Sequence, residues 1–296
     1  MNMPLNIARK LFSFYKTSKL RRLGQEPSWQ RVPAGFEMWI DPTQWLDQRM
    51  LFGVYEPWES RLIQLAVNPG ETCLDIGAHK GFFSMQMAKR VKENGNVLSF
   101  EPDPRAYASL EKNRARNQFD WIRLHSFALG ERDDEIEIRL SEKLGDTSRF
   151  ERKAKLDAFT PTARTQMKKL DDVLNETNHK IDLKQISFIK MDAEGSEPAI
   201  LAGMEKILQS SSPIISLEFH FECLKSAGTS AHEFKERLES YGFEVFRIEW
   251  TRNLFLNGRL QLKPLYFNDE EGDTVDTVAV KPDSPFRSRI QALIVN

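Results

Sequence analysis

Residues 72–84 read TCLDIGAHKGFFS, and this stretch decides the fold. Its first five residues are largely apolar or β-prone, as in a short buried strand of a parallel sheet. Gly77 and Gly81 then bracket a tight passage into a helix, because glycine permits positive φ and a close approach of the backbone. A helix N-terminus offers N–H groups and a positive dipole end to an anionic ligand group. We therefore expect a ligand site at this turn.

The chain around this stretch alternates strand-like and helix-like segments. Asp103 and Pro104 stand where an N-cap and a first helical residue belong, and Ser230 with Glu233 forms a capping box. Each strand-helix-strand passage is too long for a hairpin and suits a right-handed parallel crossover. We expect helices from about residues 57, 82, 104, 196 (to 208) and 231, and strands over 72–76, 97–100, 121–128, 185–191, 214–219, 243–248 and 274–280, the last antiparallel.

The length of the chain favours one large domain with additions, because 296 residues can bury a sizeable core. The alternation breaks over residues 130–178, where 135–140 alternates like an exposed strand and 145–164 is polar and poorly periodic. We interpret this segment as an insertion or flexible loop. We expect a basic helix and lead-in over residues 1–40, an α/β domain over 41–281 and a C-terminal tail over 282–296.

Charge and cysteine content limit the partners and the compartment. The formal net charge is −1, so no global basic field gathers the chain onto nucleic acid, and we expect no nucleic-acid partner. Cys73 and Cys223 each sit in an apolar, strand-like setting, which favours reduced packing residues over a disulfide or a metal cage. No apolar run approaches the roughly 18 residues that span a bilayer. We expect a cytoplasmic protein.

The N-terminal residues 1–23 differ from the rest because their lysines and arginines are unopposed by any acid. One interpretation is a helix that lies on an anionic membrane surface. The other is a basic amphipathic helix that packs on its own domain or is partly disordered. We favour the second because the segment is short and is interrupted by Thr17 and Ser18, and we keep peripheral membrane contact as the alternative.

Acidic residues recur where the predicted strands end. In an open parallel sheet the ligand lies beyond the carboxyl ends of the strands, near the point where the strand order reverses. Tyr55 and Glu56 precede the first helix of the domain and could reach a ligand there, although a wedge aromatic and a helix-start acid would look the same. The acids at four strand ends are Asp75, Glu101, Asp192, Glu194 and Glu218, and His220 follows the last of them.

The glycine turn discriminates between two cofactor classes. A dinucleotide site needs G-x-G-x-x-G, and His79 stands where the second glycine belongs. S-adenosylmethionine has no phosphate, and Asp75 suits its ammonium group, directly or through water, while the N–H groups of the turn suit its carboxylate. Glu101 would then accept both ribose hydroxyls, and adenine would pack against Ser126, Phe127 and Ala128 at the end of the third strand.

With these elements the chain resembles the FkbM-family methyltransferases. The matching segments come in family order over about residues 41–220: GVYEPWE, LDIGAHKGFFS, SFEPDP, FALGERD, LDDVL, KMDAEGSE and PIISLEFH. The resemblance implies an α/β, class I Rossmann-like methyltransferase fold with a mostly parallel seven-stranded sheet and helices on both faces. It also implies S-adenosylmethionine as methyl donor and O-methylation of a hydroxyl on a sugar, glycan or other natural product. The family usually has Asn after the Gly-Ala pair, and here His79-Lys80 follows.

The expected cofactor-binding set combines the glycine turn with the strand ends. Methyl transfer from a sulfonium is an in-line displacement, so the protein aligns donor and acceptor and removes one proton. We expect His220 as the general base, because imidazole titrates near working pH, and Asp192 as the second choice. Glu194, Glu197 and Glu218 would place or polarise the acceptor. The cofactor set is Tyr55, Glu56, Asp75, Gly77, Ala78, His79, Gly81, Ser84, Glu101, Pro102, Ser126, Phe127, Ala128 and Asp192.

Three other possibilities fit the sequence less well. A magnesium site from Asp192, Glu194 and Glu197 is disfavoured because residues that straddle a helix start need not converge, and His125, His179 and His232 share no zinc spacing, so we expect no metal. A nicotinamide oxidoreductase would share the sheet and Glu101 but lacks its glycine motif. A non-catalytic binding module would tolerate the fold but has no need of acids at four strand ends.

Overall fold

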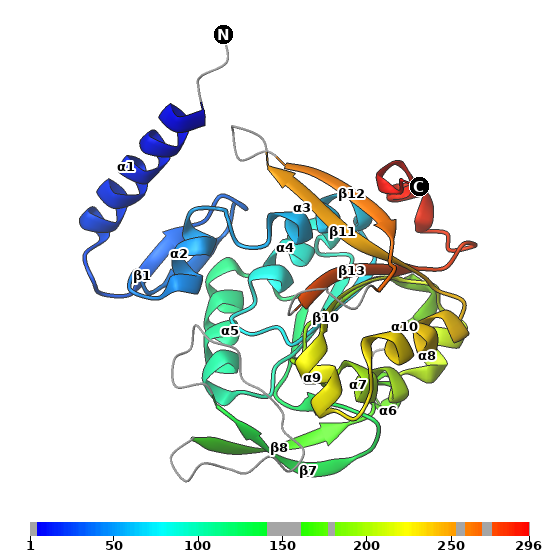
Figure 1. Cartoon of the computed structure of the whole chain (residues 1–296). Helices are drawn as coiled ribbons and strands as arrows, with labels where there is room; N and C mark the ends of the chain where they lie inside the picture. The colour runs from blue at the N-terminus through cyan, green and yellow to red at the C-terminus, as the bar shows by residue number, and fades with distance from the viewer. Residues whose placement is uncertain (1–4, 141–160, 177–180, 253–257, 268–273, 296) are drawn as a thin grey trace.

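The computed structural model describes residues 5–140, 161–176, 181–252, 258–267 and 274–295. At its centre is an eight-stranded sheet with helices on both faces (Figure 1). Strands β10, β9, β3, β4 and β5 run parallel, and β13, β11 and β12 pair antiparallel beside them. The spatial order is β12 (Gly258–Pro264), β11 (Glu244–Arg252), β13 (Thr274–Val280), β10 (Ile214–His220), β9 (Ile186–Met191), β3 (Thr72–Ile76), β4 (Asn96–Phe100) and β5 (Ile122–His125).

Strand order reverses beside β3, and this position sets the site. From β3 the chain proceeds to β4 and β5 on one side, whereas β9 and β10 lie on the other. Pairing of β3 with β9 brings Asp75 opposite Lys190 and Ile76 opposite Met191. The carboxyl ends of β3 and β9 therefore lie side by side where the strand order reverses, which is the position at which open parallel sheets bind ligands.

Helices cover the two sheet faces as two separate hydrophobic clusters. Because side chains alternate along a strand, Cys73 enters one cluster and Leu74 the other. The first cluster packs beneath α3 (Pro57–Ala66), α4 (Phe82–Val91) and α5 (Pro104–Asn117). The second packs beneath α6 (Leu170–Glu176), α7 (Glu197–Ala202), α8 (Glu205–Ser210), α9 (Phe221–Ser226) and α10 (Ala231–Ser240).

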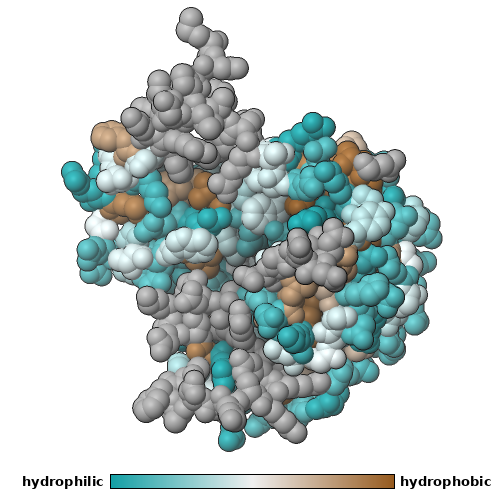
Figure 2. All heavy atoms as spheres, in the orientation of Figure 1, coloured by the Kyte–Doolittle hydropathy of each residue, from teal (hydrophilic) through white to brown (hydrophobic). Residues whose placement is uncertain are grey.

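The N-terminal part adds two helices and a small hairpin, and the hairpin lies beside α5 (Figure 1). Tyr15 of α1 contacts Phe52 edge to face at 6.0 Å, and Phe14 is 74% exposed. Among the described residues no helix is both long and apolar enough to cross a bilayer, and Figure 2 shows a largely hydrophilic face with small hydrophobic patches. Membrane contact by this segment stays a prediction. Its elements are α1 (Leu5–Leu23), β1 (Ser28–Arg31), β2 (Glu37–Ile40) and α2 (Trp45–Leu51).

The insertion contributes two strands, which join β6 just before it in a separate three-stranded sheet of order β6-β8-β7. The strand expected over 135–140 is confirmed as β7, but residues 162–164 belong to β8 and not to a loop. Residues 141–160 of the expected insertion, and 177–178, lie outside the described residues. The strands are β6 (Ala128–Leu129), β7 (Asp134–Arg139) and β8 (Thr162–Lys168), and a short 3-10 turn, η1 (Leu183–Gln185), leads into β9.

The C-terminal segment covers the outer edge of the central sheet. It contains the 3-10 turns η2 (Arg287–Arg289) and η3 (Gln291–Leu293). Arg289 pairs with Glu71 at 2.5 Å, and Ile294 bridges to Leu262 of β12. The Val295 N–H also donates to the Leu262 carbonyl oxygen at 2.9 Å. The edge strand β12 is thus partly hydrogen-bonded on its outer side.

Most predicted elements are confirmed, including the Asp103 cap, the Ser230–Glu233 capping box and the antiparallel β13. Three further expectations are wrong. The strand expected over residues 121–128 is β5 over residues 122–125 only, and Ala128 belongs to β6 of the three-stranded sheet. The sheet has eight strands instead of seven because β12 adds an edge strand. The helix expected from Ser196 to Leu208 is two helices, α7 and α8, separated by Gly203 and Met204. The domain boundaries themselves stay predictions.

Candidate active site

A cavity of about 460 Å³ opens at the carboxyl ends of β3, β4, β9 and β10. Its volume is within the usual range for small-molecule sites. The strand ends contribute Gly77, Ala78 and His79 after β3, Glu101 and Pro102 after β4, Asp192, Ala193 and Glu194 after β9, and Glu218 within β10. The acids predicted at these strand ends therefore share one cavity, with the exception of Asp75.

The glycine turn is held by its neighbours. Gly77 has φ of 78°, and a Cβ there would clash with the carbonyl oxygen of Asp192. The N–H groups of Gly77 and Ala78 both donate to the Phe100 carbonyl oxygen at 3.0 Å. This corrects the expectation that these N–H groups meet the cofactor carboxylate, because β4 already accepts from them.

Glu101 is fixed at the cavity wall by two backbone donors. Its Oε2 accepts from the His79 N–H at 2.7 Å, and its Oε1 accepts from the Asp103 N–H at 2.8 Å. His79 can aim its N–H this way because its φ is 49°. Burial raises the pKa of Glu101 to about 7. Each oxygen keeps about one further lone pair, which matches the predicted acceptance from two ribose hydroxyls.

Asp75 lies beneath the turn and does not line the cavity. The carboxylate is 1% exposed and accepts from the Ser84 hydroxyl at 2.5 Å, and Ser99 in turn donates to Ser84 at 2.9 Å. Burial raises the pKa of Asp75. Gly81 packs against Leu110 and likewise lies outside the cavity lining. Asp75, Gly81 and Ser84 therefore support the turn from below, which corrects the expectation that Asp75 holds the cofactor ammonium group directly.

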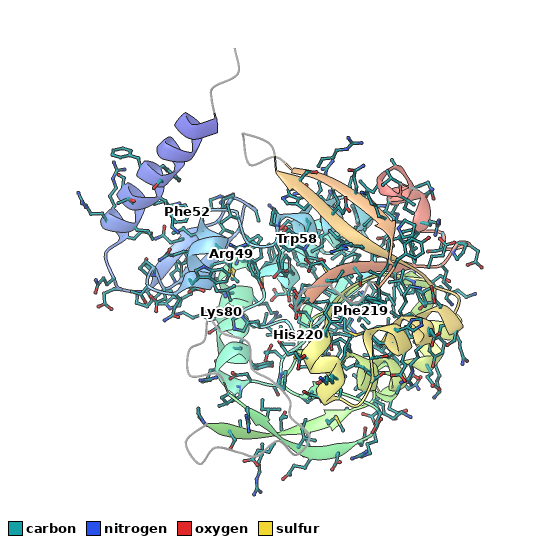
Figure 3. All side chains as sticks on the ribbon, viewed as in Figure 1. Arg49, Phe52, Trp58, Lys80, Phe219 and His220 are labelled. Carbon is teal, nitrogen blue, oxygen red and sulfur yellow. The ribbon has the colours of Figure 1, made fainter. Side chains whose placement is uncertain are left out.

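Lys80 gives the unusual His-Lys pair a structural role. Its Nζ forms a buried ion pair with Asp47 of α2 at 2.7 Å. Lys80 is labelled in Figure 3. The other Asp47 oxygen accepts from the Asp41 N–H at 2.8 Å. The Lys80 carbonyl oxygen accepts from the Asn113 side chain of α5 at 2.9 Å. Lys80 thus ties the glycine turn to α2 and α5.

One end of the cavity is apolar. Phe127 and Ala128 line it as predicted for an adenine site, whereas Ser126 is exposed and outside the lining. His125 stacks on Phe100 at 4.7 Å, and burial lowers its pKa to about 4, so the ring is a neutral packing group. The insertion sheet completes this end, which sequence reasoning missed, with Ile136, Ile138 and Met167.

The other end gathers carboxylates around one buried lysine. Lys190 bonds Asp192 at 2.9 Å and lies 5.0 Å from the Phe83 ring centroid. Burial alone would lower the pKa of Lys190, but the charges of Asp192 and Glu56 hold it well above its usual value. The ammonium group is therefore a fixed positive charge. The side chains that line this end with it are Tyr55, Glu56, Trp58, Asp192, Glu218, Thr274 and Asp276.

Asp276 was missed from the sequence because its position depends on strand register. β13 pairs antiparallel with β10 and brings Asp276 directly opposite Glu218. Burial and the charge of Asp192 together raise the pKa of Asp276 to about 6, although Lys190 and a hydrogen bond from Trp58 oppose the shift. The signal available in the sequence was a single acid, Asp276, within the otherwise uncharged late strand TVDTVAV.

Three non-glycine residues on the cavity wall adopt left-handed backbone conformations: Glu56 (φ 33°), His79 (φ 49°) and Glu194 (φ 52°). Such conformations are costly for residues with a Cβ and concentrate at functional sites. Enclosure raises the pKa of Glu56 to about 8, with Lys190 opposing the shift. The backbone of the cavity wall is therefore locally strained at these three residues.

His220 and Glu197, two predicted catalytic or acceptor-side residues, do not line the cavity. His220 caps α9, where its Nδ1 accepts from the Cys223 N–H at 3.3 Å. Glu197 accepts from the Ala193 N–H at 2.8 Å, and burial raises its pKa to about 8. Glu197 therefore holds the loop after β9, and the cavity-lining acids are better placed than His220 to meet an acceptor.

The chain is similar in sequence to known methyltransferases. The methyltransferase FkbM domain matches residues 75–245. The chain is 24% identical over 147 residues to Methyltransferase 1 of Beauveria bassiana, covering 45% of this chain and 57% of that protein. It is 25% identical over 214 residues to Methyltransferase sdnD of Sordaria araneosa, covering 62% of this chain and 78% of that protein.

Among solved structures, the methyltransferase FkbM of Methylobacillus flagellatus is similar with a TM-score of 0.42 and 15% identity, over 79% of this chain and 54% of that one. The predicted α/β fold is confirmed by the sheet, and S-adenosylmethionine is confirmed as the cofactor by the domain match. That match spans more than half of the 296 residues. The chain belongs to the FkbM family of methyltransferases.

Proposed function

We propose that this methyltransferase transfers a methyl group from S-adenosylmethionine to a hydroxyl of a sugar, glycan or other natural product, and that Asp276 accepts the hydroxyl proton. The observation that carries the proposal is the division of one cavity into an apolar end and an end where carboxylates surround Lys190. The acidic end is where an acceptor would lie.

The two ends suit the two halves of the reaction. Adenine would pack against Phe127 and Ala128, with its ribose hydroxyls on Glu101. The sulfonium and its methyl group would then point toward Lys190 and the acids. Positive charge disappears from sulfur as the methyl moves, so the protein contributes mainly alignment and removal of one proton.

Asp276 fits the role of base better than the other cavity acids. A base works best when its pKa lies somewhat below working pH, so that it is ionised and still takes a proton. The pKa of Asp276 is raised to about 6, whereas that of Glu56 is raised to about 8, which leaves Glu56 largely protonated at neutral pH. The Asp192 carboxylate is already engaged in an ion pair with Lys190 at 2.9 Å.

The acceptor class follows from the polar wall. Carboxylates at Glu218 and Asp276 and the phenol of Tyr55 can hydrogen-bond several hydroxyls at once, as a sugar or polyol presents them. Lys190 can stabilise an alkoxide that develops on the attacking oxygen.

A methyl-transfer screen tests the proposal. The full chain is incubated with methyl-labelled donor and with sugar, lipid-linked and polyketide hydroxyls, beside amine and thiol analogues of each. We expect label on hydroxyl oxygen only. Calorimetry should show binding of S-adenosylmethionine and none of NAD. Label on nitrogen or sulfur alone would overturn the acceptor class.

A matched pair of variants tests the base. Asp276→Asn should lower kcat by about 10²–10⁴, the usual contribution of a general base, with the Kd for S-adenosylhomocysteine unchanged. Asp283→Asn, an exposed aspartate a few residues later, should leave both constants as in the wild type. A normal kcat in Asp276→Asn, together with a large loss in His220→Asn, would return the role to His220.

A further inference from the structure

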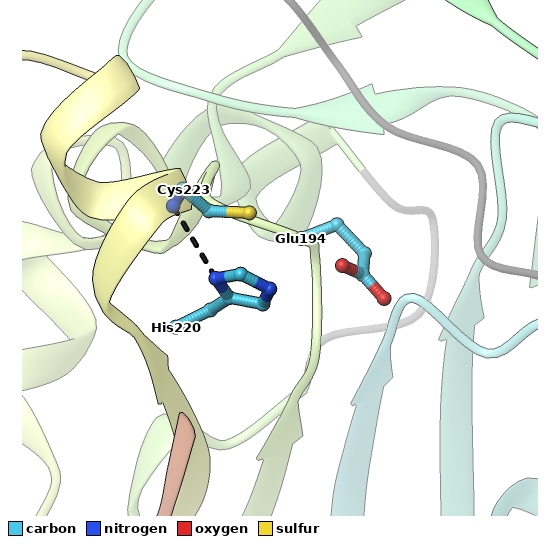
Figure 4. Close-up of side chains that lie close together, drawn as sticks. All are labelled: Glu194, His220 and Cys223. Carbon is cyan, nitrogen blue, oxygen red and sulfur yellow. Dashed lines mark hydrogen bonds between the residues drawn. The ribbon is translucent and has the colours of Figure 1, made fainter. Parts of the chain in front are cut away.

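A mixed cluster of Glu194, His220 and Cys223 lies at the edge of the cavity. One ligand atom from each, a carboxylate oxygen, a ring nitrogen and the sulfur, lie within 4.8 Å of one another. Figure 4 shows the three side chains converging, with one His220 nitrogen bonded to the Cys223 N–H and the other turned toward Glu194. We propose that these three residues bind a divalent late transition metal of the zinc type.

The fold brings the three ligands together from adjacent strand ends. His220 ends β10 and Cys223 lies in the first turn of α9, so the H-x-x-C spacing puts both on one face. Glu194 comes from the loop after β9, the parallel neighbour of β10. The next residue, Gly195, has φ of 96°, and a Cβ there would lie 2.6 Å from the Cys223 Cβ. Close packing of these loops thus holds Glu194 over Cys223.

The distances suit a metal after small side-chain movements. Zinc takes nitrogen and oxygen ligands at about 2.0–2.2 Å and sulfur at about 2.3 Å, so ligands in a tetrahedron lie roughly 3.5 Å apart. Contraction from 4.8 Å is within reach of side-chain rotation at Glu194, which is only half-buried. Metal binding through either ring nitrogen of His220 gives up the long contact of 3.3 Å from the Cys223 N–H, because a neutral imidazole has only one nitrogen with a free lone pair.

The donor set selects the kind of metal. Thiolate and imidazole are soft or borderline ligands that favour zinc and its neighbours, whereas magnesium and calcium prefer oxygen alone. Three protein ligands leave a fourth position for water or an acceptor oxygen. Since Glu194 also lines the cavity, the ion would lie at the cavity wall. The inference is independent of the proposed acceptor chemistry.

The second cysteine provides an internal control. Cys73 is fully buried in β3, and its Sγ lies 3.9 Å from the Ser187 hydroxyl. Within the described ranges, His, Cys, Asp and Glu side chains converge with metal-ligand spacing at the Glu194 cluster and not at Cys73. Any thiolate–metal signal that this site produces must therefore come from Cys223.

Cobalt(II) titration of the full chain, made without a polyhistidine tag and stripped by chelator, tests the site. We expect a near-ultraviolet thiolate-to-cobalt absorption band that saturates at one ion per chain and is displaced by Zn²⁺. Cys223→Ser should abolish the band, and Cys73→Ser should keep it. Absence of the band in the wild type, or its persistence in Cys223→Ser, overturns the proposal.

A second variant separates ligation from folding. His220→Asn keeps a side chain that caps a helix N-terminus well but removes the imidazole. The variant should weaken cobalt binding at least about tenfold, while its urea midpoint stays near that of the wild type. Unchanged cobalt affinity in a folded His220→Asn also overturns the proposal.

Discussion

Glu218 of β10 and Asp276 of β13 are direct cross-strand partners, and both carboxyl groups line the cavity. Two acids opposite each other in a partly buried place cannot easily both ionise. Burial and the neighbouring charge of Asp192 raise the pKa of Glu218 to about 7 and that of Asp276 to about 6. Asp276 is therefore the acid of this pair that ionises first as pH rises.

The order of ionisation predicts the pH dependence of methyl transfer. If ionised Asp276 is the base, kcat/KM rises with pH through about 6 and levels above it. In Asp276→Asn this acid limb should disappear from the residual activity. Asp283→Asn serves as the control and should keep the limb. The measurement is kcat/KM from pH 5 to 9, and an unchanged limb in Asp276→Asn would count against the assignment.

Gly77 should tolerate no side chain. Its φ is 78°, and a Cβ would meet the Asp192 carbonyl oxygen, whereas Gly70 has φ of 84° and no atom within 4 Å of the position that a Cβ would take. Gly70→Ala should therefore cost about 1–2 kcal/mol from backbone conformation alone. Gly77→Ala should cost a further 1–3 kcal/mol or so from overpacking. Urea unfolding of both variants measures the difference, and equal costs would refute the clash.

The ion pair between Lys80 and Asp47 should behave as a buried one. Lys80→Met leaves a buried carboxylate unpaired, and Asp47→Asn leaves a buried ammonium group unpaired, so each should cost about 3–5 kcal/mol of unfolding free energy. The double variant should cost much less than the sum. The exposed pair of Arg132 and Asp134 gives the contrast, since Asp134→Asn should cost under about 1 kcal/mol. Additive losses at Lys80 and Asp47 would show that the pair does not interact.

Glu59 should make the protein less stable as pH rises. Burial raises its pKa to about 7 from the ordinary 4.5, and its Oε1 is buried with no hydrogen-bond partner among the described residues. Between those two values the folded state binds more protons than the unfolded state, so unfolding free energy falls with rising pH by on the order of 3 kcal/mol.

Glu59→Gln removes this titration while keeping the shape of the side chain. The loss of stability between pH 5 and pH 8, measured by urea unfolding, should be smaller in Glu59→Gln than in the wild type. The exposed Glu26→Gln should lose as much stability as the wild type does over that range. Equal losses in all three proteins would mean that Glu59 ionises normally when folded.

Local sequence patterns predicted the parallel core and the cavity wall formed by the glycine turn and Glu101. The strand at residues 72–76, the turn at Gly77 and the Asp103 cap each follow from backbone preferences of a few adjacent residues. Glu101 could be placed because acids at the ends of parallel strands meet at one edge of the sheet. These features could be predicted because each is determined by residues close together in the sequence.

Asp276 and Lys80 could not be placed in the same way because their positions depend on contacts between distant residues. Asp276 reaches the cavity only through its antiparallel register with Glu218, 58 positions earlier in the chain. Lys80 finds Asp47 across 33 residues. His220 stands at a strand end, as expected of a base, but its ring turns into the first turn of α9, and no local pattern specifies that rotamer.

The covered outer edge of β12 bears on how the protein behaves at high concentration. An open edge strand can add a strand from a second molecule and so begin sheet growth between chains. Here Leu262 already bonds Val295, and Arg289 anchors the covering segment to Glu71. The segment covers this part of the edge, and we expect Arg289→Ala to loosen it and to increase self-association at high protein concentration.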